Sequence, residues 1–102
     1  MFTLCIRYTI DPGKVADFAA YAKGIAKPIA RCGGTVRGYF LPTKFAGPTN
    51  VALALIDFAD LAAYEAYRAK LAADDDNIQH ARRAEAAGCI LVEDRSFMQA
   101  VD

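Results

Sequence analysis

The sequence has little histidine or cysteine and no excess of either charge. One histidine and three scattered cysteines match neither the ligand spacing of a metal site nor a disulfide framework. Twelve Lys and Arg balance twelve Asp and Glu, and no basic stripe with interleaved aromatics argues for a nucleic-acid surface. We therefore expect no metal, haem or other cofactor, no nucleic-acid partner, and a reduced, cytoplasmic protein.

Long hydrophobic runs are absent too. No apolar run approaches the roughly 18 residues of a membrane span, and the N-terminus lacks the charged region of a signal peptide. At 102 residues we expect a single domain, 1–102. Apolar residues make up 55% of the chain, and a domain this small cannot bury them all, so part of the apolar surface is expected to face a partner.

The first twelve residues predict a strand that leads directly into a helix. Asp11 is a candidate N-cap and Pro12 suits the first helical position, where its missing N–H costs nothing. The strand before them, residues 2–10, has one apolar face. Its apolar residues recur at every second position: Phe2, Leu4, Ile6, Tyr8 and Ile10.

The following helix is expected to end near Arg31, with Gly33 or Gly34 as a left-handed stop. Pro28 lies within its apolar pattern. Because proline lacks the N–H and its ring clashes with the preceding turn, we expect a kink or break near residues 26–27.

The rest of the chain completes a split βαβ pattern. Its expected elements are a strand at 35–41, an exposed loop at 42–50, a strand at 51–58, a helix capped by Asp60, a short helix ended by Gly88, and a strand at 89–98. The order β-α-β-β-α-β with right-handed crossovers predicts an α+β, ferredoxin-like fold. Four strands form one antiparallel sheet, with the helices on one face.

The other face of that sheet needs a cover. The strand at 51–58 is apolar on both sides through Ile56, as in strands that are buried on both faces. No spare helix remains to cover it. We therefore expect a homodimer in which two sheets pack face to face.

The chain resembles the NIPSNAP family of the dimeric α+β barrel superfamily over nearly its whole length. The segments that carry the resemblance, in order, are Arg7-Tyr8, Pro12-Gly13-Lys14 with Phe18, Ile56 to Leu61, Tyr64 to Arg68 with Leu71 and Asp74, and Arg95 to Met98. The resemblance implies a dimeric ferredoxin-like barrel and no particular reaction. Other members of the superfamily include cofactor-free monooxygenases, lactone isomerases and haem enzymes, which is an analogy of fold only.

A ligand site is expected on the sheet face opposite the helices. Strand parity places Arg7, Arg37 and Tyr39 there, and Arg95 joins them in one of two registers of the last strand. A guanidinium offers a planar fork to a small carboxylate or phenolate. In the alternative, the arginines form ion pairs with acidic residues of the sheet or of the partner: Asp57, Glu93 and Asp94.

Catalytic residues are not identified by the sequence, and His80 is only a weak candidate. As the single histidine it could act as a base at the rim of the site; the alternative is a solvated side chain. Three functions stay open: a dimeric module that binds a small molecule or a protein, a cofactor-free monooxygenase- or isomerase-like enzyme for a small aromatic or polyketide-like compound, and a structural subunit.

Overall fold

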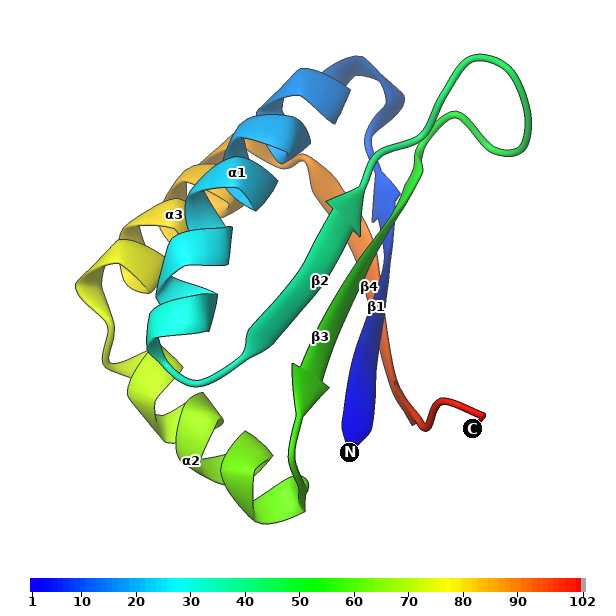
Figure 1. Cartoon of the computed structure of the whole chain (residues 1–102). Helices are drawn as coiled ribbons and strands as arrows, with labels where there is room; N and C mark the ends of the chain where they lie inside the picture. The colour runs from blue at the N-terminus through cyan, green and yellow to red at the C-terminus, as the bar shows by residue number, and fades with distance from the viewer. Residues whose placement is uncertain (102) are drawn as a thin grey trace.

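A computed structural model of the protein describes residues 1–101 (Figure 1). Its elements in chain order are β1 (Phe2–Ile10), a 3-10 turn η1 (Pro12–Lys14), α1 (Val15–Arg31), β2 (Thr35–Phe40), β3 (Val51–Phe58), α2 (Leu61–Ala72), α3 (Asp75–Ala87) and β4 (Ile90–Met98). The strands pair in the order β2-β3-β1-β4, and every pairing is antiparallel. The three helices lie on one side of the sheet (Figure 1). The expected α+β, ferredoxin-like fold is confirmed.

The strand-to-helix junction forms as its residues predict. The Asp11 side chain accepts a hydrogen bond of 3.0 Å from the Gly13 backbone N–H, and this caps η1 at the entry to α1. At the other end Gly33 has φ of +113°, a region that L-residues avoid. Of the expected kink or break near residues 26–27, the break is absent, since α1 continues through Pro28 to Arg31. Pro28 is buried, and burial of its apolar ring is a favourable contribution to stability.

Two helices cross back from β3 to β4, and the second, which the sequence predicts to be short, is a full helix of 13 residues. Asp60 caps α2 by accepting from the Ala63 N–H at 2.8 Å, and Asp74 caps α3 in the same way from Asn77 at 3.0 Å. Gly88, with φ of +67°, ends α3. Leu61, in the first turn of α2, is 52% exposed.

The core lies between the sheet and α1. Alternate residues of β1 and β3 face the helices and pack against one side of α1: Leu4, Ile6, Tyr8, Ile10, Ala52, Ala54, Ile56, Phe58, Phe18, Ala22, Ile25 and Ile29. The opposite sheet face is only partly covered within the chain, and Leu53 of β3 is 37% exposed there.

The connection between β2 and β3 extends beyond the sheet as a loop (Figure 1). Most of residues 41–50 are exposed, which confirms the expected surface position of this segment. Among residues 1–101, no helix has both the length and the hydrophobicity required to cross a membrane.

Candidate ligand-binding site

A β-bulge in β2 decides which residues share a face. Val36 pairs with Ile56, but the next paired residue is Gly38, opposite Leu55. Arg37 is therefore an extra residue in this strand, and the alternation of side chains shifts after it. Tyr39 consequently faces the helices and packs against the core.

The predicted trio of Arg7, Arg37 and Tyr39 is thereby divided. Arg7 and Arg37 are exposed on the face away from the helices, whereas Tyr39 lies on the other face. The prediction that the three residues line one site is wrong. It assumed that side chains alternate strictly along β2, and the bulge interrupts this alternation. Whether either arginine binds a ligand on its own face stays a prediction.

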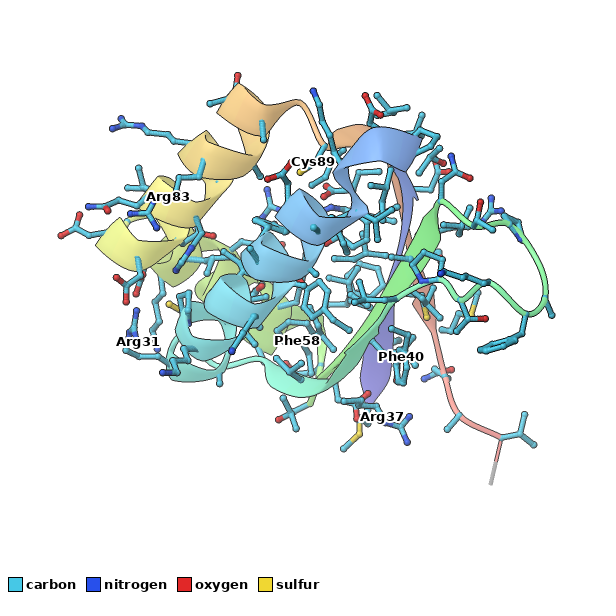
Figure 2. The ribbon with its side chains drawn as sticks, turned by 90° about the horizontal axis from the view of Figure 1, so that it is seen from above. Arg31, Arg37, Phe40, Phe58, Arg83 and Cys89 are labelled. Atoms are coloured by element: carbon cyan, nitrogen blue, oxygen red, sulfur yellow. The ribbon has the colours of Figure 1, made fainter. Side chains whose placement is uncertain are left out.

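Arg37 has an acidic neighbour, as the alternative interpretation expected. Its Nε lies 3.6 Å from Oδ2 of Asp57, and Oδ1 of Asp57 accepts a hydrogen bond of 2.6 Å from the Thr3 hydroxyl. The Arg37 side chain is 55% exposed, and Figure 2 shows it at the periphery of the molecule, far from Arg83 of α3. Arg37 is thus part of a polar cluster on the outer sheet face.

The helix side of the sheet contains a cavity of about 370 Å³. Its floor comes from all four strands and its roof from the three helices. Four tyrosines, two arginines, one glutamate and one asparagine provide its polar lining: Tyr8, Tyr21, Tyr39, Tyr67, Arg68, Arg95, Glu93 and Asn77. Most of the remaining wall is aliphatic, including Ile6, Ile25 and Ile29.

The register of β4 brings a charged pair to this cavity. Glu93 is the partner of Tyr8 and Arg95 the partner of Ile6, so both face the helices, as these β1 residues do. Arg95 Nε donates to Glu93 Oε2 at 3.0 Å, and Arg95 Nη2 lies 3.0 Å from the same oxygen. The structure thus settles the open register, with Arg95 on the opposite face from Arg7 and Arg37.

The tyrosines form a cluster of uncharged phenols. The hydroxyls of Tyr8 and Tyr39 are 3.5 Å apart, and their rings stack with centroids 6.1 Å apart. Burial raises the pKa of Tyr39 and of Tyr67 to about 12. Burial raises the pKa of Tyr8 and Tyr21 further. All four are therefore protonated near neutral pH and able to donate hydrogen bonds into the cavity.

His80 lies outside this cavity. It is half-buried and lines a smaller hollow of about 230 Å³ between α1 and α3, with Asp17, Tyr21 and Arg83. Its ring packs directly over Gly24 of α1. The prediction that His80 lies at the rim of a site with Arg37 and Tyr39 is wrong, because α3 directs the His80 side chain towards α1. Within residues 1–101, no group of three His, Cys, Asp or Glu is placed to hold a metal ion.

Sequence reasoning missed most of the polar lining. The apolar alternation of residues 2–10 indicates packing for Tyr8 rather than a polar role, and the position of Glu93 depends on the register of β4. A usable signal was present: several tyrosines on inward-facing positions of a small domain each bring a hydroxyl that requires a polar environment.

NIPSNAP proteins share this architecture. The NIPSNAP family model matches residues 3–102. The solved structure of protein Atu4242 from Agrobacterium tumefaciens has 20% identity and a TM-score of 0.87, covering 99% of this chain and 94% of that chain. A NIPSNAP family protein from the same species, Atu5224, has 24% identity and a TM-score of 0.84, covering 99% and 86%.

A putative antibiotic biosynthesis monooxygenase from Nitrosomonas europaea also has this fold. Its TM-score is 0.73 over the full length of both chains, at 9% identity, which is a likeness of fold alone. No curated protein matches the chain. The family model spans nearly all of the sequence. The sequence segments that resemble the NIPSNAP family are distributed over the same range. The chain belongs to the NIPSNAP family.

Proposed function

We propose that this protein binds a small anionic or phenolic molecule in the cavity between its sheet and its helices. The observation that carries the proposal is the lining of the 370 Å³ cavity by four phenols and a half-exposed guanidinium, that of Arg95. Small-molecule sites are usually concave and combine apolar walls with converging polar groups that fix the orientation of the ligand.

The charges at the cavity favour an anion. Arg68 and Arg95 contribute two positive charges and Glu93 one negative charge, so the lining is net positive. Because Arg95 meets Glu93 through Nε and Nη2, its third nitrogen, Nη1, lies outside this contact. A carboxylate or phenolate would bind at this end, while the isoleucines of α1 and β1 would contact an aromatic or aliphatic body.

The test is a binding measurement with two matched compounds, 4-hydroxybenzoate and the uncharged 4-hydroxybenzamide. We expect the acid to raise the melting temperature more than the amide. Arg95→Gln is expected to weaken acid binding about tenfold or more, the usual effect of losing a charge-assisted hydrogen bond. Arg82→Gln, an exposed change on α3 away from the cavity, is the control and should bind as the wild type does. Equal affinity of Arg95→Gln and wild type would contradict the proposal.

We also infer that the protein is a homodimer through the outer sheet face. This face exposes large apolar side chains: Phe40, Leu53, Val92 and Met98. A stable interface of this kind buries about 800 Å² per partner.

The three cysteines are free thiols, which is consistent with the cytoplasmic location that we propose.

A further inference from the structure

Glu93 is a carboxylate that is held at one oxygen and available at the other. Both contacts from Arg95 fall on Oε2, and neither involves Oε1. The Glu93 side chain is 31% exposed and lines the cavity. An ionised carboxylate has lone pairs on both oxygens, so Oε1 can accept a proton from a molecule in the cavity.

Phenol donors line the same cavity as this carboxylate. Glu93 is opposite Tyr8 in the strand register, so their β-carbons are about 5 Å apart. Tyr21 and Tyr39 line the same cavity as Glu93 and Arg95. Burial is the main reason that the pKa of Tyr21 and Tyr39 is raised; the charge of Glu93 raises both further, whereas Arg95 opposes the rise. Both charged groups therefore lie within electrostatic reach of the same two phenols.

This combination has a recognisable chemistry. A base beside uncharged hydroxyl donors can remove a proton from a carbon next to a carbonyl group, because the donors stabilise the oxyanion that develops. A guanidinium in the same space holds an acidic substituent of the molecule.

We propose that the cavity catalyses enolisation of a small keto acid, with Glu93 as the proton acceptor and the phenols of Tyr8 and Tyr39 as hydrogen-bond donors to the carbonyl oxygen. This inference rests on the proposed binding function and adds a reaction to it. Arg95 binds the carboxylate of the keto acid.

The reaction balances without an oxidant or a cofactor. Oε1 of Glu93 takes a proton from the carbon next to the carbonyl, and the C–H electron pair becomes the C=C bond of an enolate. The π pair of the carbonyl moves onto oxygen, which accepts hydrogen bonds from the phenols. The protonated Glu93 exchanges its proton with water and then returns a proton to carbon. Alternatively, it transfers its proton to the enolate oxygen, which regenerates the carboxylate, and the enol leaves. In heavy water the cycle replaces carbon-bound hydrogen with deuterium.

The experiment follows this exchange in phenylpyruvate, whose methylene protons are next to its ketone. The ¹H NMR signal of the methylene group is recorded in buffered D₂O with and without the protein. We expect the wild type to accelerate loss of the signal over buffer. Glu93→Gln should lower the protein-dependent rate by about 10²-fold or more, the usual contribution of a general base, and Tyr39→Phe should lower it by a smaller factor.

Asp94→Asn is the matched control, because Asp94 is the next residue of β4, on the outer face opposite Arg7. It removes the same charge and should leave the rate unchanged. Glu93→Asp keeps the charge with Arg95 but withdraws the carboxylate, so it should fold as the wild type does and still lose most of the rate. A wild-type rate equal to that of buffer, or an unchanged rate in Glu93→Gln, would overturn the proposal.

A second measurement separates this inference from the binding function. Saturation-transfer NMR reports binding of 3-phenylpropionate, which has the ring and the carboxylate but no ketone. Binding of this compound together with an absence of exchange in phenylpyruvate would overturn enolisation and leave the binding proposal standing. Absence of binding for both compounds would overturn both.

Discussion

Arg37 and Tyr39 are two residues apart in β2, yet their side chains lie on opposite faces of the sheet. The bulge at Arg37 inserts one residue between the pairs Val36–Ile56 and Gly38–Leu55. Tyr39 then lines the cavity with Tyr8, while Arg37 contacts Asp57 on the outer face. One local irregularity therefore places the two side chains in different surroundings.

Substitutions at these two positions should have different effects, one on ligand binding in the cavity and the other on the exposed contact of Arg37 with Asp57. Tyr39→Phe removes a hydroxyl of the cavity and should weaken binding of 4-hydroxybenzoate, measured by isothermal titration. Arg37→Ala should leave that affinity unchanged. Because the Arg37 side chain is 55% exposed and its Nε lies 3.6 Å from Asp57 Oδ2, loss of this contact should lower the free energy of unfolding by at most about 1 kcal/mol. Weaker ligand binding in Arg37→Ala than in Tyr39→Phe would contradict this assignment.

The contact between Gly24 and His80 predicts that Gly24→Ala destabilises the wild-type protein but stabilises a variant that lacks the His80 ring. A methyl group at Gly24 would overlap the His80 ring, so Gly24→Ala should destabilise the protein by about 1–3 kcal/mol. In the His80→Ala background the space is open, and the same change should stabilise α1 by up to about 1 kcal/mol through helix propensity. Urea unfolding of the four proteins measures this coupling. Additive effects of the two substitutions would exclude the contact.

The apolar outer face predicts self-association. Leu53 lies near the middle of that face, between Arg7 of β1 and Phe40 of β2, and is exposed in the single chain. Leu53→Arg should place a charge in the proposed interface and convert the dimer to a monomer. Sedimentation velocity at micromolar concentration measures both species. A monomeric wild-type protein at that concentration would refute the dimer.

The hydrogen bonds of the Asp74 carboxylate predict that the free energy of unfolding decreases in acid. Its carboxylate accepts hydrogen bonds from Arg31 at 2.7 to 3.1 Å and from the Asn77 N–H, and these contacts, Arg31 first, lower its pKa. Because the folded pKa is below the unfolded value of about 3.9, the stabilisation is full above that value and disappears as the pH falls through the folded pKa.

Asp74→Asn is the test of this linkage. Asparagine retains the N-cap but not the charge, so the variant should be less stable than the wild type at pH 7. The difference should shrink as the pH falls below about 4. Urea unfolding across pH measures it, and a difference that stays constant down to acidic pH would show that the Arg31 contact is unimportant.

The loop at 42–50 should exchange its amide hydrogens quickly. Its residues are mostly exposed, and the strand pairing of β3 starts at Val51. Hydrogen exchange should therefore be fast over this segment and slow over residues 51–56. Similar protection in the two segments would require a different strand boundary.

The sequence by itself determined the features that depend on near neighbours. The bounds of β1 and β3, the caps at Asp60 and Asp11, and the stop at Gly88 agree with the structure. Each of these follows from a side chain acting on the backbone within a few residues, or from a simple alternation of apolar positions. The order of these elements was sufficient for the ferredoxin-like topology.

Only the tertiary structure decided which residues line the cavity. Tyr8, Tyr39, Tyr67 and Glu93 come from four different elements, and their meeting depends on two bulges, one in the pairing of β2 with β3 and one in that of β1 with β4. A bulge reverses which side chains face the core without altering the composition of the strand. Strand pairing and helix packing act between residues far apart in the chain, so the site residues could not be assigned from the local pattern.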